Sequence, residues 1–222
     1  MSFMDDAIEE VRDIWDACAA EEFLDEMADG SLDHDQFFDY IVQDSIYLRG
    51  YLKEFAFAII KSSTLREMQM YYSLLGFVND GENVTRLSYL GEHGMTDADV
   101  DKAEMRPQCR SYLEFLWENA VNGTQEDILM ATLPCMMGYN HVFESLRSRA
   151  PRVMKGYFGP LVADYTSDGF RECCRLWRGV ADEKCDGLDE SRKSELRETF
   201  RQASLHELYF WQMAGEKNHE TR

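Results

Sequence analysis

The stretch TLPCMMGYNH, residues 132–141, places a thiol and a phenol at a spacing that could do chemistry. Cys135 and Tyr139 are four residues apart, so in a helix they share one face. Pro134 removes a backbone hydrogen bond and bends a helix, which opens space beside the thiol. A thiol becomes a nucleophile when a base or a lowered pKa supplies the thiolate. A buried cysteine that packs as a small apolar side chain is the alternative interpretation.

A carboxylate interrupts the apolar pattern of the last strong helical segment, which we predict at about residues 191–214. Its inward positions, spaced three and four residues apart, are Leu196, Phe200, Ala203, Glu207, Phe210 and Ala214. A buried carboxylate must find a partner or a ligand, or take up a proton. Glu207 is therefore a candidate for acid or base chemistry, and an ion pair between two helices is the alternative.

A second carboxylate lies among phenols in the segment 36–60, which we predict as one continuous amphipathic helix. Its apolar positions are Phe38, Ile41, Ser45, Leu48, Leu52, Phe55 and Ile59, and beside them runs a stripe of Tyr40, Asp44, Tyr47 and Tyr51. Asp44 and Glu207 are both candidate bases for Cys135. Phenols can also donate hydrogen bonds to a carboxylate within a purely structural network.

Helical periodicity dominates the whole chain. Asp33 with Gln36, and Thr124 with Asp127, resemble helix starts. Further helices are predicted from the spacing of Leu65, Met68, Tyr72 and Leu75, from residues 126–147, and from Phe170, Cys174 and Trp177. Period-two segments rich in Val, Ile and Thr are missing, and no Ser/Gly/Pro-rich linker divides the chain. We therefore predict a single all-α domain, a helical bundle spanning residues 1–222.

The amino-acid composition of the chain argues against nucleic acids and membranes as its binding partners. The 42 acidic and 23 basic residues give a formal charge of −19, which disfavours a nucleic-acid partner. The N-terminal residues lack the basic and apolar regions of a signal peptide, and the longest apolar run, FAFAII, is too short to cross a membrane. The six cysteines show no CxxC spacing, as expected of reduced thiols. We expect a cytoplasmic protein with no membrane partner.

Metal and histidine chemistry find little support in the sequence. Glu216 and His219 form the only Glu-x-x-His pair of the kind that di-metal helical bundles use, and they lie in a polar tail. His141 and His206 remain open as partners for a cysteine nucleophile. No phosphate loop or dinucleotide fingerprint is present. We predict no metal site and no cofactor.

Five motifs in order resemble the thiaminase II (TenA) family, whose members have the haem-oxygenase-like all-α fold. They are FFDYIVQDSIYL at 37–48, Tyr112 in SYLEFL, LPCMMGY at 133–139, ADYTSDGF at 163–170 and ELYFW at 207–211. Their order and spacing agree from about residue 15 to 214. The resemblance implies hydrolysis of 4-amino-5-aminomethyl-2-methylpyrimidine, and in many members of thiamin, in thiamin salvage. It also implies a homotetramer.

The resemblance assigns roles to residues at matching positions. Cys135 is the implied nucleophile and Glu207 the carboxylate that holds the pyrimidine edge, while Asp44 contacts the ring amino group or the nucleophile. The remaining pocket wall is implied to consist of Tyr47, Tyr112, Tyr139, Tyr165 and Phe210.

Two positions depart from the family pattern. Met137 and Leu161 stand where members usually carry tryptophan. We interpret both changes as a loss of aromatic bulk near the pocket, which broadens or shifts the substrate range. Two alternatives remain at this point: another enzyme of the same fold, such as a pyrroloquinoline-quinone synthase-like or di-iron oxidase, and a non-catalytic pyrimidine-binding or regulatory protein.

Overall fold

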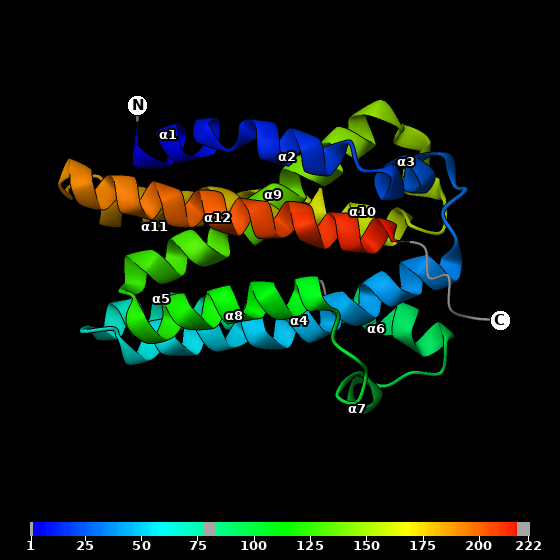
Figure 1. The fold of residues 1–222 in the computed structure, drawn as a ribbon, viewed down its shortest axis with the longest axis horizontal. Coiled ribbons are helices and arrows are strands. Elements are labelled where there is room, and N and C mark those ends of the chain that lie inside the picture. The colour runs from blue at the N-terminus through cyan, green and yellow to red at the C-terminus, as the bar shows by residue number, and fades with distance from the viewer. Residues whose placement is uncertain (1, 78–82, 217–222) are drawn as a thin grey trace.

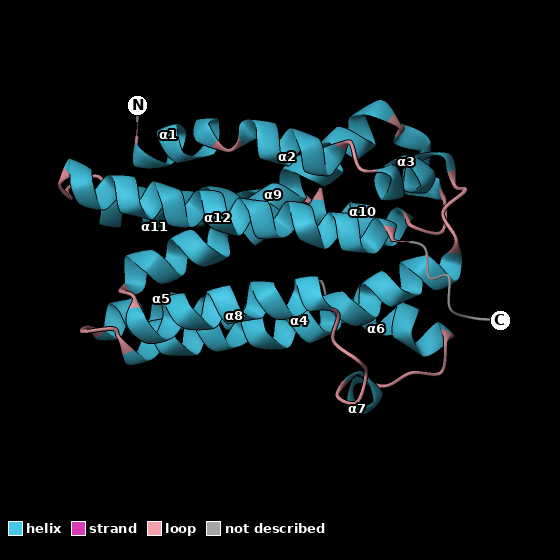
Figure 2. Ribbon diagram, viewed as in Figure 1, coloured by secondary structure: helices cyan, strands magenta, loops and turns pink. Residues whose placement is uncertain are grey.

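The computed structural model describes residues 2–77 and 83–216, and every regular element in these two ranges is a helix (Figure 2). The α-helices are α1 (Phe3–Glu10), α2 (Arg12–Ala19), α3 (Glu22–Asp29), α4 (His34–Ile60), α5 (Leu65–Phe77), α6 (Asn83–Glu92), α7 (Asp97–Val100), α8 (Pro107–Asn122), α9 (Gln125–Arg149), α10 (Gly159–Tyr165), α11 (Asp168–Cys185) and α12 (Glu190–Gly215). A 3₁₀ helix, Pro151–Lys155, connects α9 to α10. The prediction of an all-α bundle is confirmed.

Two groups of helices face each other along the long axis of the molecule (Figure 1). One group contains α9 and α12, which pack along each other and are flanked by α2 and α11. The other contains α4 and α8, with α5 and α6 against α4. Both α8 and α4 also contact α9 and α12, so the interior between the groups is walled by four long helices. No helix in the described ranges is long and apolar enough to cross a bilayer.

The predicted helix starts are present. Asp33 caps α4, and its side chain accepts hydrogen bonds from the backbone N–H groups of residues 35 and 36. Thr124 and Asp127 form a reciprocal capping box at the start of α9. Such caps satisfy N–H groups that have no partner within the helix. They fix where α4 and α9 begin, and therefore which residues reach the interior.

Helix α9 runs through Pro134 without ending. Its buried residues surround the helix rather than forming one stripe, because α2, α8, α11 and α12 all pack against it. In α4 the phenol stripe is more uniformly buried than the neighbouring apolar one: all four of its residues are buried, whereas Phe38, Leu52 and Ile59 are half-buried. Asp44 thus lies in the protein interior.

The helix predicted from Leu65, Met68, Tyr72 and Leu75 is present as α5, but its apolar stripe is not buried by this chain. The exposed fractions of Leu65 and Tyr72 are 69% and 70%, and Met68 is exposed as well. The side chain of Leu75 lies outside the described residues. Tyr71 of α5 is buried in the core, where its ring packs against that of Trp177.

Gly50 in α4 tests how closely α8 packs on this helix, and Gly179 in α11 serves as the control. A Cβ atom at Gly50 would overlap the side chain of Leu113, whereas a Cβ at Gly179 in α11 would meet nothing. Alanine gains about 1 kcal/mol of helix propensity over glycine. Overpacking a core costs about 1–3 kcal/mol. We expect the control Gly179→Ala to raise the free energy of unfolding by about 0.5–1 kcal/mol, and Gly50→Ala to give a smaller gain or a loss, because the side chain of Leu113 must move. Urea denaturation measures both, and equal gains in the two variants would contradict the packing of Leu113 on Gly50.

Candidate active site

The carboxyl group of Glu207 lies in the interior, where α12 faces α8. Only 2% of the residue is exposed, and the Tyr112 hydroxyl donates a hydrogen bond of 2.6 Å to its Oε1 atom. Burial raises the pKa of Glu207 to about 8, although hydrogen bonds from Tyr112 and Cys135 act in the opposite direction. At neutral pH Glu207 is therefore mainly a neutral acid that holds a proton.

The Cys135 thiol reaches the same carboxyl group from α9. Cys135 is half-buried. Cys18 on α2 is a second thiol close to Glu207, but it is fully buried, and desolvation together with the charge of Glu207 raises the pKa of Cys18 far above its usual value. Of these two thiols, Cys135 is the less buried.

Asp44 and Tyr47 bring the phenol stripe of α4 to the opposite wall. Asp44 is 5% exposed, and its negative charge contributes to the raised pKa of Tyr139. Tyr47 packs its ring 4.8 Å from that of Tyr112 and 5.8 Å from that of Phe210. The buried Tyr47 hydroxyl makes no hydrogen bond of ordinary geometry among the described residues, but it faces the Tyr112 hydroxyl closely enough to oppose the rise in the pKa of Tyr112. A small rotation would therefore let it donate either to Tyr112 or to a ligand.

The remaining wall consists of aromatic rings. Tyr139 lies one helical turn after Cys135, and its ring centroid is 5.0 Å from that of Tyr165. The Tyr40 hydroxyl lies 3.4 Å from the Tyr139 hydroxyl. The eight site residues expected from the sequence thus come from α4, α8, α9, α10 and α12, and they converge on one interior region.

Two further residues support the site in roles that the sequence did not predict, although His206 was open as a partner for the cysteine. The His206 ring stacks on Tyr112 with a centroid distance of 5.1 Å, and burial lowers the pKa of His206. Trp211 stacks on Tyr40 at 5.6 Å and packs against Tyr139. Both rings hold phenols of the site in position. Trp211 belongs to the ELYFW motif, so the sequence did contain a signal for it.

The structure corrects the expectation for Met137. Its side chain lines a separate pocket with Trp15 and Cys174, on a different face of α9 from Cys135, since two residues along a helix differ by about 200°. His141 lines the same separate pocket and pairs with Asp16, which places it away from Glu207. Leu161 is buried in α10. The exchange at position 137 is therefore no argument for a wider active site.

This arrangement can perform acid catalysis together with covalent catalysis. A neutral carboxylic acid can donate a proton to a ring nitrogen, while a thiol beside it can add to the activated ring. Within the described residues no three His, Cys, Asp or Glu side chains gather as metal ligands would. His219, from the Glu216–His219 pair considered above, lies outside those residues.

The sequence profile of the TENA/THI-4/PQQC family matches residues 8–217, nearly the whole chain. The chain belongs to this family. It is also 27% identical, over 96% of each chain, to a protein named aminopyrimidine aminohydrolase from Halalkalibacterium halodurans.

Comparison with solved structures shows that this chain has the expected haem-oxygenase-like fold. A TenA family transcription regulator from Silicibacter sp. TM1040 superposes with a TM-score of 0.86, covering 97% of both chains at 23% identity. A domain of unknown function from Shewanella denitrificans OS217, described as having a heme oxygenase-like fold, superposes with a TM-score of 0.71 at 14% identity, covering 95% of this chain and 91% of that one.

The raised pKa of Glu207 predicts how stability depends on pH. The folded state binds this proton more tightly than the unfolded state does, so stability falls as the pH rises from about 4.5 to about 8. The side chain of glutamine resembles the neutral acid, and we expect Glu207→Gln to remove up to about 4 kcal/mol of this decline. Urea denaturation of both proteins over that pH range measures the difference.

Two further variants serve as controls for that experiment. Glu54 is also buried, and burial raises its pKa to about 7. Glu54→Gln should therefore remove a smaller part of the decline in stability than Glu207→Gln does, and that part should end near pH 7. The variant Glu183→Gln, at an exposed position, should show the same dependence of stability on pH as the wild type. An unchanged slope in Glu207→Gln would mean that Glu207 is ionised in the folded protein.

Proposed function

We propose that this protein is an aminopyrimidine hydrolase of thiamin salvage. It releases ammonia from 4-amino-5-aminomethyl-2-methylpyrimidine to give the 5-hydroxymethyl compound, and thiamin is a second candidate substrate. The observation that carries the proposal is the buried Glu207 carboxyl, held between the Tyr112 hydroxyl and the Cys135 thiol, whose burial raises its pKa. The name of the Halalkalibacterium halodurans relative, and the same name for a Helicobacter pylori relative 24% identical over 91% of this chain, support it.

The reaction begins with activation of the pyrimidine ring. An aminopyrimidine resists a thiolate until a ring nitrogen is protonated or strongly hydrogen-bonded. Glu207 holds a proton at neutral pH and supplies it to that nitrogen. Asp44 accepts the thiol proton of Cys135 or a hydrogen bond from the 4-amino group. The Tyr47 hydroxyl adds a hydrogen bond to the bound ring.

Cys135 then acts as the nucleophile. Its sulfur forms a bond to a ring carbon, and the ring loses its aromaticity. Electrons from the 4-amino nitrogen expel ammonia as the bond from the exocyclic methylene to nitrogen breaks. Water adds to that methylene, and the carbon–sulfur bond breaks to restore the aromatic ring and the thiol. The covalent intermediate divides one difficult displacement into easier steps.

The aromatic side chains around Glu207 and Cys135 favour a planar substrate. The rings of Tyr139, Tyr165 and Phe210 line the interior beside the acid and the thiol, and Tyr47 packs on Phe210. Flat apolar rings with a few placed hydroxyl groups suit a small planar heterocycle. The proposed catalytic residues need no metal or organic cofactor for any step.

A matched pair of cysteine variants tests the nucleophile. We expect Cys135→Ser to lower the rate of ammonia release from 4-amino-5-aminomethyl-2-methylpyrimidine by about 1,000-fold or more, because serine is the weaker nucleophile without an adjacent strong base. Cys174→Ser is the control, since Cys174 is also half-buried but lies on α11, in the separate pocket. An assay of ammonia with purified protein measures both.

Each outcome of that assay has a distinct meaning. Comparable losses in both cysteine variants, or full activity in Cys135→Ser, would contradict the role of Cys135. A wild type that binds the pyrimidine without turnover would instead be a pyrimidine-binding protein. If neither binding nor turnover occurred, the substrate class would be wrong.

We also propose that the chain assembles as a homotetramer. Helix α5 exposes Leu65, Met68 and Tyr72, and Ile60 at the end of α4 is exposed as well. Clusters of exposed apolar side chains commonly mark protein interfaces. Sedimentation should give the mass of four chains for the wild type and a smaller mass for Leu65→Glu with Tyr72→Glu. Tyr209→Glu, at an exposed tyrosine of α12, is the control. A monomeric wild type would contradict the assembly.

A further inference from the structure

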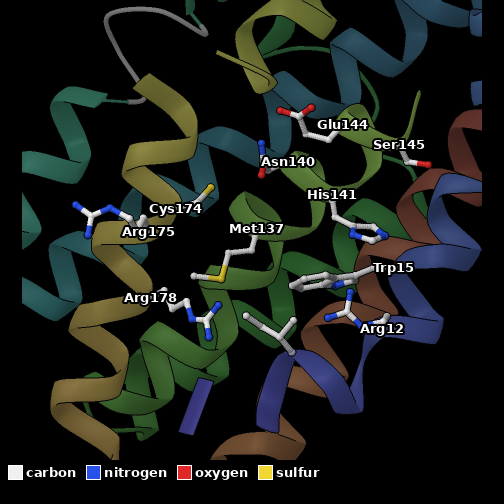
Figure 3. Close-up of a pocket in the computed structure, with 11 residues that line it drawn as sticks. Arg12, Trp15, Met137, Asn140, His141, Glu144, Ser145, Cys174, Arg175 and Arg178 are labelled. Carbon is white, nitrogen blue, oxygen red and sulfur yellow. The ribbon is translucent and has the colours of Figure 1, made fainter. Parts of the chain in front are cut away.

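Arg106, at the start of α8, joins this helix to two others. The arginines that border the separate pocket, Arg12, Arg175 and Arg178, each pair with one carboxylate in a solvent-exposed ion pair (Figure 3). Arg106 differs from them, because only 16% of its side chain is exposed and it contacts both α4 and the C-terminal end of α12. A contact of this kind fixes the position of one helix relative to another.

The guanidinium group of Arg106 binds a carboxylate of α4 and a carbonyl of α12 through different nitrogen atoms. Its Nη2 atom lies 2.7 Å from Oδ2 of Asp39, and its Nη1 atom donates to the backbone carbonyl of Met213 at 3.2 Å. Met213 is buried in the last turn of α12, where carbonyl groups lack partners within the helix. This last turn, which the structure describes in full, contains no basic residue, so the cation that favours a helix C-terminus comes from the start of α8.

Neighbouring hydrogen bonds hold both ends of this contact on α4. The Oε1 atom of Gln43 accepts from the backbone N–H of Arg106 at 3.0 Å, and its Nε2 atom donates to the backbone carbonyl of Glu104 at 2.9 Å. Gln36 donates to the backbone carbonyl of Ala214 at 2.8 Å. The start of α8 and the end of α12 are therefore both fixed on the same helix.

The hydrogen bond between Tyr112 and Glu207 lies equally far from this contact along both helices. Tyr112 follows Arg106 by six residues and Glu207 precedes Met213 by six residues, which is about 9 Å of helix in each case. The stacking of His206 on Tyr112 is an apolar contact that tolerates small shifts along the helix axis. A hydrogen bond of 2.6 Å does not, because it weakens steeply with distance and angle.

We propose that Arg106 is a positioning residue for the carboxyl group of Glu207. By holding the end of α12 against the start of α8 and against Asp39, it fixes how far the two helices slide along each other, and therefore whether the Tyr112 hydroxyl reaches Glu207. Its effect on the reaction rate rests on the proposed function, in which Glu207 donates a proton. Its effect on the carboxyl group itself depends on no reaction.

Infrared difference spectroscopy at pH 6 tests this positioning without a substrate. The spectrum of each protein minus that of the same protein with Glu207→Gln isolates the band of the Glu207 carboxyl group. Tyr112→Phe gives the position of this band without the hydrogen bond. We expect Arg106→Gln to move the band most of the way toward its position in Tyr112→Phe. Combining both changes should move it no further, because both act on one contact.

Arg149→Gln is the matched control. Arg149 also pairs with a carboxylate, that of Asp25, and donates to a carbonyl at the end of a helix, that of Ala19 in α2, at 3.1 Å. The two variants therefore lose the same kinds of contact, and urea denaturation measures the loss of stability in each. Arg149→Gln should leave the Glu207 band at its wild-type position.

A milder variant keeps the test decisive if Arg106→Gln does not fold. Asp39→Asn weakens one contact of the Arg106 guanidinium group and leaves its hydrogen bond to Met213. We expect the Glu207 band to move in the same direction as in Arg106→Gln, by a smaller amount.

The rate of ammonia release from 4-amino-5-aminomethyl-2-methylpyrimidine is the second readout. We expect Arg106→Gln to lower kcat by about tenfold or more, because small displacements of a catalytic group are costly, and Arg149→Gln to retain the kcat of the wild type. A wild type without turnover would contradict the proposed function, while the spectra would still decide the role of Arg106.

Three results would overturn the proposal. One is a Glu207 band at its wild-type position in the folded variants of Arg106 and Asp39. Another is an equal shift in Arg106→Gln and Arg149→Gln, which would mean that a general loss of stability moves the carboxyl group. The third is a further shift when Arg106→Gln is added to Tyr112→Phe, which would show that Arg106 acts on Glu207 by another route.

Discussion

The hydrogen bond from Tyr112 to Glu207 is the contact on which the site depends. A carboxyl group this deeply buried is costly when it is charged, and in the folded protein it either stays neutral or is held by donors. The structure uses both solutions: burial raises the pKa to about 8, and the Tyr112 hydroxyl donates from 2.6 Å. The result is an acid that still holds its proton at neutral pH.

The surrounding helices exclude water from the Glu207 carboxyl group and hold it in a fixed orientation. Stacking of His206 on Tyr112 fixes the donor, and Tyr47 closes the opposite side. Helix α9 brings Cys135 to the same carboxyl group, while its other faces pack on α2 and α11. The separate pocket follows from this geometry, because a helix covered on all sides presents Met137 to different neighbours from those of Cys135.

Much of this arrangement could be predicted from the sequence. Glu207 was found because it occupies an inward position of a regular apolar stripe, and Asp44 because phenols flank it at helical spacing. The start of α9 followed from Thr124 and Asp127, whose capping box is a local interaction. Local signals of this kind need no knowledge of the partner helices.

The errors concern contacts between distant segments. Met137 was placed near the active site because it stands where family members usually carry tryptophan, and α9, whose buried residues surround it, has no polar face that would show which side is which. The stripe of α5 predicted a helix correctly, but apolar periodicity does not reveal whether the covering surface belongs to the same chain. The support of Tyr112 by His206 depends on how α8 and α12 meet, which no local pattern encodes.

The protonation state of Glu207 is the central claim, and infrared difference spectroscopy tests it most directly. The spectrum of the wild type minus that of Glu207→Gln at pH 7 should contain the carbonyl stretching band of a neutral carboxylic acid. Because Glu54 is present in both proteins, its contribution cancels. The band should disappear as the pH rises through about 8. A difference spectrum with only carboxylate bands at pH 7 would show that Glu207 is ionised, and would contradict its role as the proton donor.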